Sequence, residues 1–535
     1  MNMELQVQRF LCSRYFIFTS IALSFWLGLG WVPLFDLDEG AFTEATREML
    51  SSGVYSATYL DGEPRYDKPI FFYWIQALSI STLGFNEWAF RLPSVIAACL
   101  WAWAVYRFVD EFYNDTRARI AALFLVNTII VAFIARAAIA DALLNLFLSL
   151  TLFDIWRYIN TKREPYVLRL YLWMALGTLT KGPVAVAVPL LVSFLYLISR
   201  RELVQYYRCY FNWKGWSIYL ALVSPWLIFV FLEQGSGFFH GFIVEHNLKR
   251  FSDTRESHGG SIFYYIGILP LILLPISGLL FYVLKSAKSI ALSQLERFLA
   301  LWFLTIFILF SFSKTQLPHY ILNGCVPLII LMATIPKLEK HARWTPIFAI
   351  FFASIFLFLP EILGVAAANS DGYDAAALAL YTDAIPEHYR IYAILLVTAI
   401  LVISFIPKLL TWQRLAILGC LLNTFVFTQV VHIASQLQQA PIHHAIRFLE
   451  NNYPETPVVA YRMHMPTFSV YRHKITPLRA PVAGEIALVR VDRIKRLENL
   501  LTDQKHVHER IFRSGALALV RVHPLEHTAS TSTSE

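Results

Sequence analysis

The chain has 535 residues, of which 57% are hydrophobic and only 15% are charged, and its mean hydropathy is +0.52. A soluble domain carries about 25% charged residues, so the composition excludes an ordinary soluble globular protein. A net charge of +8 is compatible with nucleic-acid binding, but much of the positive charge lies in short connectors between apolar runs, as membrane topology requires. We therefore predict a polytopic helical membrane protein that does not bind nucleic acid.

The first apolar run extends from about residue 15 to 34. It is too long for a signal-peptide core and is not followed by a small-residue cleavage site, so we expect a retained first span. The cysteines lie in or beside apolar runs and form neither a disulfide framework nor a CxxC metal pattern. They are Cys12, Cys99, Cys209, Cys325 and Cys420.

The pattern predicts about thirteen spans, with uncertain ends. They are centred near residues 24, 98, 126, 146, 174, 190, 223, 272, 304, 327, 355, 398 and 421. With the N-terminus in the cytoplasm, every second connector is basic, as the positive-inside rule requires. These connectors hold Arg107, Arg117 and Arg119; Arg157, Lys162 and Arg163; Arg200, Arg201 and Arg208; Lys285, Lys288 and Arg297; Lys337, Lys340 and Arg343; and Lys408 and Arg414. An odd number of spans places the C-terminus outside.

The outer connectors have a different composition. The first, at about 35–87, is long and acidic, and within it 40–51 and 70–83 have a helical composition but are too short or too polar to span, so we expect them to lie along the membrane interface. Two further outer loops lie at about 233–261 and 313–320. No repeated halves are visible, which argues against an alternating-access transporter.

Hydropathy falls from about residue 438, which divides the chain into a transmembrane part (1–437) and a small α/β domain (438–535) on the outer face. A helix is predicted in PIHHAIRFLENN, and strands in TPVVAYRM, TFSVYRHKI, EIALVRV and ALALVRV. A Thr/Ser-rich disordered tail is expected from about residue 527.

Charged groups at membrane depth are costly and therefore mark functional sites. Those on the predicted outer side come from several connectors yet share one face, which indicates a polar cavity at the outer membrane surface. They are Asp38, Glu39, Asp67, Lys68, Arg136, Asp141, Lys181, His246, Lys249, Arg250 and Lys314.

Two motifs within the first outer loop carry alternative interpretations. In LFDLDEG (34–40) the acids suit either a helix N-terminus or a general base that takes a proton from an attacking hydroxyl. In YDKP (66–69) Asp67 and Lys68 form either an interfacial ion pair before a helix that Pro69 starts, or a site in which Lys68 binds a phosphate and Asp67 a divalent cation.

Three later motifs are similarly open. VEHNLKRF (244–251) supplies an imidazole and two cations, or is a basic helix end that snorkels to the interface. Asp141 begins an apolar span, so it is either an N-cap or a catalytic acid. In SKTQLPHY (313–320) a turn before a span is the simpler interpretation, but Lys314, His319 and Tyr320 would all face the same cavity.

Together these motifs resemble a known family. DLDEGAFTEATREML, YDKPIFFYWIQALSISTLGFNEWAFRLPS, ARAAIADALLNLFL, LGTLTKGPVA, VEHNLKRF and FSKTQLPHYIL follow the order and approximate spacing of the bacterial branch of the protein O-mannosyltransferase superfamily. Within it the chain is most similar to the lipid A aminoarabinose transferases. The resemblance covers residues 15 to about 430 well and the outer domain more loosely.

The resemblance implies a GT-C glycosyltransferase fold in the bacterial inner membrane, with a periplasmic active site and C-terminal domain. It implies a sugar donor carried on undecaprenyl (polyprenyl) phosphate. Asp38 matches the acidic catalytic position, with Glu39 beside it, and Asp141 matches a second acidic position at the cavity. Asp67 and His246 match the positions of a divalent metal (Zn, Mg or Mn), and Lys68 with Arg250 or Lys249 matches the lipid-phosphate site, with Tyr320 in the same cavity.

Two departures from the family pattern bear on the substrate. The family usually has Glu before the Lys-Pro, whereas Asp67 is one methylene shorter, which puts metal coordination in question. Aminoarabinose transferases tend to have Arg-Tyr after the Asp-Glu, whereas this chain has Gly40, Ala41 and Phe42, so the donor sugar can differ from aminoarabinose.

The leading hypothesis is therefore sugar transfer from a polyprenyl phosphate to lipid A or another envelope acceptor. The alternative acceptor is a protein Ser/Thr hydroxyl, as in the protein O-mannosyltransferases. A flippase for phosphorylated lipids, in which the same cations bind head groups without chemistry, is the alternative of another class, and a scaffold protein would not gather acids and cations on one face.

Overall fold

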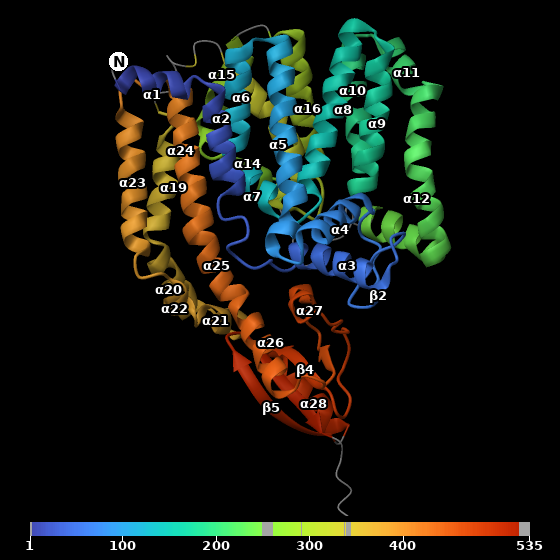
Figure 1. Cartoon of the computed structure of the whole chain (residues 1–535). Coiled ribbons are helices and arrows are strands. Elements are labelled where there is room, and N and C mark those ends of the chain that lie inside the picture. Colours follow the sequence, from blue (N-terminus) through green and yellow to red (C-terminus); the bar gives the residue numbers. More distant parts are fainter. Residues whose placement is uncertain are drawn as a thin grey trace, which may run out of the picture.

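The computed structural model describes residues 3–248, 261–289, 292–335, 338, 344–504 and 506–523. Upright helices form the larger part of the molecule, and a small unit with a β-sheet lies beyond one end of them (Figure 1). The chain begins at the opposite end of the upright helices, where α1 lies across their tips (Figure 1). The structure thus has a helical part and a smaller α/β unit.

The first half of the helical part contains most of the site. Its elements are α1 (Met3–Leu11), α2 (Arg14–Ile21), η1 (Ala22–Trp26), α3 (Asp38–Ser52), β1 (Tyr59–Leu60), β2 (Glu63–Pro64), α4 (Phe71–Leu83), α5 (Glu87–Phe112), α6 (Asp115–Asn127), α7 (Ile129–Arg136), α8 (Asp141–Thr161), α9 (Glu164–Lys181), α10 (Val184–Ser199), α11 (Leu203–Tyr210), α12 (Trp213–Phe239) and η2 (His240–Leu248).

The second half completes the bundle. Its elements are α14 (Tyr264–Ile272), η3 (Ile276–Gly278), α15 (Leu279–Ser289), α16 (Gln294–Ser311), η4 (Pro318–Ile321), α17 (Leu322–Ala333), α19 (Ile347–Leu357), α20 (Leu359–Asn369), α21 (Gly372–Leu378), α22 (Tyr381–Ala384), α23 (Tyr389–Phe405), α24 (Thr411–Phe425), η5 (Val426–Val430) and α25 (Val431–Gln438).

A multi-pass membrane protein is confirmed. Among the described residues, five helices are long and apolar enough to cross a membrane, and three further helix pairs qualify if each bent pair is one span. A helix lies at every predicted span centre, but thirteen crossings remain a prediction. The first span is shorter than predicted, because helical structure ends at Trp26 and Gly28 then adopts a left-handed φ of 71°, which turns the chain out of the helix.

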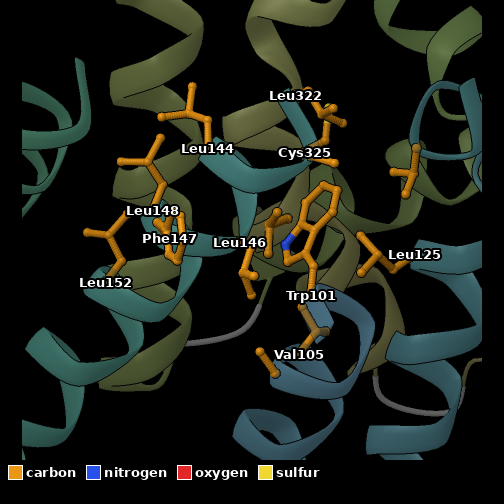
Figure 2. Close-up of a cluster of buried hydrophobic side chains, with 14 of the residues drawn as sticks. Trp101, Val105, Leu125, Leu144, Leu146, Phe147, Leu148, Leu152, Leu322 and Cys325 are labelled. Atoms are coloured by element: carbon orange, nitrogen blue, oxygen red, sulfur yellow. The ribbon is translucent and has the colours of Figure 1, made fainter. Parts of the chain in front are cut away.

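Large apolar side chains from four helices hold the bundle together. Figure 2 shows Trp101 and Val105 of α5 beside Leu125 of α6, Leu146 of α8 and Cys325 of α17. The indole N–H of Trp101, which is fully buried, donates a 2.9 Å hydrogen bond to the hydroxyl of Ser149, so its polar atom is satisfied inside the core. This core holds α8 in place, and Asp141 is the first residue of that helix.

The first outer loop folds as predicted. Helices α3 and α4 lie across the ends of the upright helices on the side of the β-sheet unit (Figure 1), and the short antiparallel pair β1–β2 lies between them in the chain. The rings of Phe42 in α3 and Tyr73 in α4 stack with their centroids 5.2 Å apart. The loop is therefore a packed platform that can position side chains against the upright helices.

The C-terminal unit is a four-stranded mixed sheet with helices on both faces. It comprises α26 (Ala440–Asn452), β3 (Val458–Ala460), α27 (Pro466–Arg472), β4 (Ile486–Arg490), η6 (Val491–Arg493), α28 (Ile494–Asp503), β5 (Val507–Ser514) and β6 (Leu517–His523). The strand order is β3-β4-β6-β5, with β3 parallel to β4 and the other pairs antiparallel.

Side chains alternate between the two faces of this sheet, as the strand period requires. In β4, Ile486 and Leu488 pack in the cluster that contains Ile442 of α26, whereas Ala487 and Val489 pack in the cluster that contains Leu497 of α28. Because both faces are covered, the central strands are apolar throughout, which is why EIALVRV and ALALVRV were recognisable from the sequence.

One predicted strand is wrong. TFSVYRHKI has the β-branched and aromatic composition of a strand, but Pro466–Arg472 forms the helix α27, with proline in its first turn. Its buried side chains contact the first outer loop instead of a neighbouring strand. The strand β5 in turn was not predicted, because its residues are largely exposed or half-buried and carry little apolar signal.

Helix α27 docks the C-terminal unit onto the helical part through every second residue. The backbone N–H and the hydroxyl of Thr467 donate to Asp36, the hydroxyl of Ser469 donates to Asp61 at 2.7 Å, and the hydroxyl of Tyr471 donates to Glu87 at 3.0 Å. Burial raises the pKa of Asp36 to about 7, although the hydrogen bonds from Thr467 oppose the rise. The C-terminal unit is therefore held directly against the loop that carries the site.

Candidate functional site

A cavity of about 430 Å³ lies between the outer loop and the upright helices, and we call it the lysine cavity. Its polar lining comes from five separate parts of the chain: Asp67, Lys68, Asp141, Lys181, His246, Ser313, His319, Tyr320 and Asn323. Its apolar lining is Leu144, Pro183, Val184, Ala187, Val188, Leu191, Ile243, Leu309 and Phe310. The predicted convergence of Asp67, Lys68, Asp141, His246 and Tyr320 on one cavity is therefore observed.

Asp67 is held by two cations. The guanidinium of Arg65 forms a forked contact with it through Nε and Nη2, the latter at 2.9 Å, and the Nζ of Lys68 lies 3.3 Å from Oδ2. Burial alone would raise the pKa of Asp67, but Arg65 and Lys68 hold it well below its usual range. The carboxylate stays ionised and keeps the Lys68 side chain, which is only 13% exposed, at the cavity wall.

A second ion pair also lines the cavity. The Nζ of Lys181, at the end of α9, is 2.6 Å from Oδ1 of Asp141, at the start of α8. The same ammonium lies 5.9 Å from the centre of the Tyr320 ring. Asp141 is therefore neither a simple N-cap nor an isolated acid, since it fixes a cation in the cavity.

The donor set around Asp67 and His246 does not fit a divalent metal. Both oxygens of Asp67 already accept from Arg65 and Lys68, and cations at that position repel a second cation. Within the described ranges, the one group of three potential metal ligands is Glu44, Glu48 and Asp61, and it includes neither of these two residues. We therefore derive no step through a metal.

The Glu44, Glu48 and Asp61 group is itself a poor metal site at neutral pH. Burial raises the pKa of Glu44 to about 8, against the opposing effect of its hydrogen bonds with Arg47. Arg47 contacts both carboxylate oxygens of Glu44, at 2.7 and 2.6 Å. Because both oxygens of Glu44 already accept from Arg47, this carboxyl group is not free to bind a cation.

Asp38 lies outside the lysine cavity. It is the first residue of α3 and is exposed. Its charge reaches the site through Arg65: burial alone would lower the pKa of Arg65, whereas Asp67 and, more weakly, Tyr73 and Asp38 raise it. Asp38 is therefore exposed to solvent, yet close enough to Arg65 to raise the pKa of that arginine.

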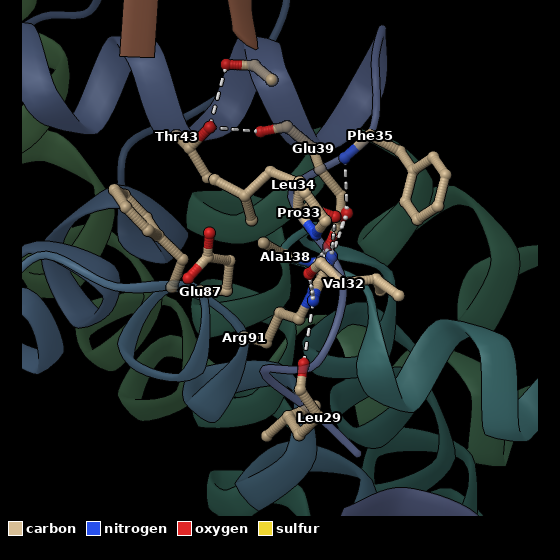
Figure 3. Close-up of polar contacts among 12 residues, drawn as sticks. Leu29, Val32, Pro33, Leu34, Phe35, Glu39, Thr43, Glu87, Arg91 and Ala138 are labelled. Carbon is tan, nitrogen blue, oxygen red and sulfur yellow. Dashed lines mark hydrogen bonds and ion pairs between the residues drawn. The ribbon is translucent and has the colours of Figure 1, made fainter. Parts of the chain in front are cut away.

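Both carboxylate oxygens of Glu39 are engaged in a buried ion pair with Arg91 (Figure 3). Its Oε1 accepts from Arg91 Nε at 2.9 Å and from the backbone N–H of Ala138 at 2.8 Å, and its Oε2 accepts from Arg91 Nη2 at 2.9 Å and from the backbone N–H of Phe35 at 2.9 Å. Burial alone would raise the pKa of Glu39, but Arg91 lowers it. This carboxylate has no free lone-pair direction for a substrate proton, so its predicted catalytic role is not supported.

The N–H donors of Arg91 are likewise all engaged in hydrogen bonds. Besides its two bonds to Glu39, it donates to the carbonyl oxygens of Leu29, Val32 and Pro33, each at 2.8 Å. A guanidinium has five N–H donors, and all are used. The pair therefore locks the turn at residues 29–39 onto α5.

Three cations that the sequence predicted are not observed in the lysine cavity, and two arginines of the site were not predicted. Lys249 and Arg250 lie outside the described residues, so their predicted place at the lipid phosphate is not observed. Lys314 is exposed and does not line the lysine cavity, contrary to the prediction. Arg65 was missed, although its position two residues before Asp67 was the available signal, and Arg91 was missed because its partner Glu39 is 52 residues away.

The fold is that of a known class. A crystal structure of ArnT from Cupriavidus metallidurans bound to undecaprenyl phosphate superposes with a TM-score of 0.79 at 18% identity, covering 95% of this chain and 97% of that one. The apo form of the same protein superposes with a TM-score of 0.77. The chain therefore has the GT-C fold that its motifs implied.

Sequence comparisons give the same resemblance. Residues 67–229 match the family model of dolichyl-phosphate-mannose-protein mannosyltransferases. The undecaprenyl phosphate-alpha-4-amino-4-deoxy-L-arabinose arabinosyl transferase 1 of Proteus mirabilis is 30% identical over 331 residues, which are 61% of this chain and 59% of that protein. A relative of the same description in Aeromonas hydrophila is 31% identical over 56% of each chain. The chain thus spans about three fifths of the length of the curated relatives that it matches.

The buried pair gives a first prediction. Arg91→Leu leaves the Glu39 carboxylate buried without its partner, which destabilises a protein by about 3–5 kcal/mol. We expect a loss of that size in the free energy of unfolding, measured by denaturant titration of the purified protein in detergent.

The matched control is Arg390→Leu. Arg390 pairs with Glu361 at the surface, with side chains 65% and 49% exposed, and such pairs contribute less than about 1 kcal/mol. Equal stability of the two variants would show that the Glu39–Arg91 pair does not hold the turn.

Proposed function

We propose that the protein is an inner-membrane glycosyltransferase that moves a sugar from an undecaprenyl (polyprenyl) phosphate donor to lipid A or another component of the lipopolysaccharide-bearing envelope. The relatives' printed names describe arabinosyl transferases acting from undecaprenyl phosphate, and the ArnT structure holds undecaprenyl phosphate. The departures at Gly40, Ala41 and Phe42 leave the donor sugar a separate question.

The observation that carries the proposal is the composition of the lysine cavity. Lys68 and Lys181 supply ammonium groups at one wall, and Val184, Val188 and Leu191 of α10 supply an apolar wall. A polyprenyl phosphate has the matching chemistry, with a phosphate that binds cations and an isoprenoid chain that binds apolar surface. A soluble nucleotide-sugar would not need the apolar wall.

The residues take the following roles. Lys68, positioned by Asp67 and Arg65, holds the phosphate, and Tyr320 with Lys249 or Arg250 completes the phosphate site. Lys181 adds positive charge, oriented by Asp141. Glu39 is a positioning residue, because it fixes the turn that presents its neighbour Asp38. Asp38 is the general base.

The transfer needs no chemical group beyond the donor, the acceptor and these side chains. A lone pair of the acceptor oxygen forms a bond to the anomeric carbon as the bond from that carbon to the phosphate oxygen breaks. Polyprenyl phosphate leaves with the electron pair, and Lys68 stabilises its developing charge. The proton of the acceptor hydroxyl goes to the Asp38 carboxylate.

We further propose that the lysine cavity and the C-terminal unit face the periplasm. The connectors after α5, α8 and α10 lie at the end of the bundle opposite the sheet (Figure 1), and these are basic connectors of the cytoplasmic kind. A periplasm-dependent reporter such as alkaline phosphatase, fused after Ser532, should therefore be active. A cytoplasm-dependent reporter active at that point would reverse the orientation.

Donor binding depends on the charge of Lys68. Lys68→Met keeps the length of the side chain and removes its charge, and a hydrogen bond to a charged group is worth about 1.5–3 kcal/mol. We expect undecaprenyl phosphate to bind about 10- to 100-fold more weakly, measured by equilibrium binding of radiolabelled lipid to purified protein.

Lys314→Met is the control for this variant. Lys314 is exposed and does not line the lysine cavity, so its loss should leave donor affinity unchanged. Equal affinity of the Lys68→Met variant and the unaltered protein would refute the phosphate role of Lys68.

Turnover depends on the basicity of Asp38. Asp38→Asn keeps the size of the side chain and removes its ability to take a proton, which should lower the transfer rate about 10²- to 10⁴-fold without weakening donor binding. The measurement is transfer from a radiolabelled polyprenyl-phosphate sugar. Glu63→Gln, which alters an exposed acid of the same loop, should keep its rate, and near-normal turnover by Asp38→Asn would move the base to another residue, with Asp141 next.

A further inference from the structure

A groove of about 440 Å³ runs between α2 and α5, toward the end of the bundle where α1 lies (Figure 1). We call it the α2–α5 groove. Its lining residues recur every three or four positions, at 14, 17, 18 and 21 of α2 and at 99, 102, 103, 106, 107 and 110 of α5, so it is formed by one face of each helix. Both helices pack on α6. The buried Ala102 and Ala122 also line the groove, and their small side chains leave its space open.

The part of the groove that lies deeper in the bundle is apolar. Helix α2 begins and α5 ends at the α1 end of the bundle, so Ile17, Phe18 and Ile21 of α2, and Cys99 and Trp103 of α5, lie further from that end. Phe18 and Trp103 are 65% and 61% exposed. Because α5 is long and apolar enough to cross a membrane, these exposed side chains lie where lipid chains surround the protein.

The part of the groove nearest α1 is polar. Arg14 is the first residue of α2, and Tyr106, Arg107 and Asp110 lie in the last two turns of α5. The guanidinium of Arg14 lies 5.8 Å from the centre of the Tyr106 ring, so the polar residues of the two helices meet at this end. The groove therefore has the polarity of an amphiphile, with a polar end and an apolar end.

The charged groups at the polar end leave an excess of positive charge. Asp115 pairs with Arg119 at 2.8 Å, whereas Arg14 lies 3.7 Å from it and has a side chain that is 71% exposed. Arg107 and Asp110 form no ion pair with any residue that the structure describes. Three arginines against two aspartates leave one positive charge, and both arginines of the groove itself, Arg14 and Arg107, are exposed.

The groove has the depth of one lipid leaflet. Cys99 and Arg107 are eight positions apart on α5, which is about 12 Å along a helix, and half of the hydrocarbon core of a bilayer is about 15 Å. The polar end lies at the level of the basic connectors, which mark a membrane surface. A phospholipid with its phosphate at Arg107 would therefore reach Cys99 with its acyl chain.

We infer that the α2–α5 groove binds a glycerophospholipid with an anionic head group, of the phosphatidylglycerol type. Arg14 and Arg107 bind its phosphate, and an acyl chain lies along Phe18 and Trp103. Basic pockets between transmembrane helices bind anionic head groups in this way. With the orientation proposed above, the lipid belongs to the cytoplasmic leaflet.

This lipid is neither the donor nor the acceptor of a sugar. The groove lies at the opposite end of the bundle from α3 and α4, which carry the outer loop of the lysine cavity (Figure 1). A lipid that contacts both α2 and α5 holds the first span against the bundle. The inference therefore does not depend on the proposed function, and the bound lipid should stabilise the protein by mass action.

The test uses two lipids that have the same acyl chains and different head groups. Radiolabelled dioleoylphosphatidylglycerol should bind the delipidated protein in detergent about 10-fold more tightly than dioleoylphosphatidylcholine, and should raise its Tm more. Arg14→Gln combined with Arg107→Gln should weaken phosphatidylglycerol binding about 10- to 100-fold, because the hydrogen bonds to a charged phosphate are lost. The same change should leave phosphatidylcholine binding nearly unaltered. Inorganic phosphate should not displace the lipid, because it lacks the apolar part.

Three single variants serve as controls. Arg208→Gln removes an exposed arginine that does not line the groove, and should keep the affinity for phosphatidylglycerol. Lys68→Met should also keep it, although it weakens undecaprenyl phosphate binding in the lysine cavity. Cys99→Trp narrows the apolar part with both arginines intact, and should weaken both phospholipids.

The possible outcomes are distinct. Equal affinity for the two phospholipids, or unchanged phosphatidylglycerol affinity in the double arginine variant or in Cys99→Trp, would overturn the proposal. Loss of phosphatidylglycerol binding in Lys68→Met would place the lipid in the lysine cavity and overturn it as well. Binding that depends on Arg14 and Arg107, in a protein that transfers no sugar, would keep the lipid site and refute the proposed function.

Discussion

The buried pair between Glu39 and Arg91 determines the geometry of everything at the outer end of the bundle. Two charges removed from water are stable only when their remaining hydrogen-bonding capacity is also satisfied, and here all five guanidinium donors and both carboxylate oxygens are used. The pair joins the turn after the first span to α5 and, through Ala138, to the segment before α8. It thereby sets where α3 begins, and so where Asp38 lies, and it lines a second cavity of about 320 Å³.

The same requirement separates structural charges from functional ones. Deep in the bundle, Asp154 of α8 is 1% exposed and is bound by Arg157 and Arg169, and by the indole N–H of Trp173 at 3.1 Å. That group is self-contained and adjoins no described cavity. In the lysine cavity, by contrast, Asp67 and Asp141 are paired with cations that also line an apolar-walled space. Cations held at the wall of such an apolar space indicate an anionic lipid better than the charges alone do.

Much of the lysine cavity could be predicted from the sequence because charged residues are rare in so apolar a chain. Asp67, Lys68, Asp141, His246 and Tyr320 each stand out at the end of an apolar run, and positive-inside topology brings those ends together. What could not be predicted was which acids are already engaged. Glu39 looked as available as Asp38, because its partner Arg91 lies on another helix and pairing at that separation leaves no mark in local spacing.

The errors in the fold have similar causes. The composition of TFSVYR favours a strand, but α27 is set by Pro466 and by contacts of Thr467, Ser469 and Tyr471 with a distant loop, and long-range packing overrides such local preferences. The first span was predicted too long because hydropathy continues past Trp26, whereas the left-handed Gly28 ends the helix. The sheet strands β4 and β6 were predictable because burial on both faces makes them continuously apolar.

The account depends most on where a polyprenyl phosphate binds. A cryo-electron microscopy structure of the protein with undecaprenyl phosphate measures this directly. We expect a phosphate oxygen about 2.7–2.9 Å from the Nζ of Lys68, as in charge-assisted contacts, with the isoprenoid chain along Val184, Val188 and Leu191. A phosphate bound at Arg136 instead, with the lysine cavity filled by solvent, would contradict the account.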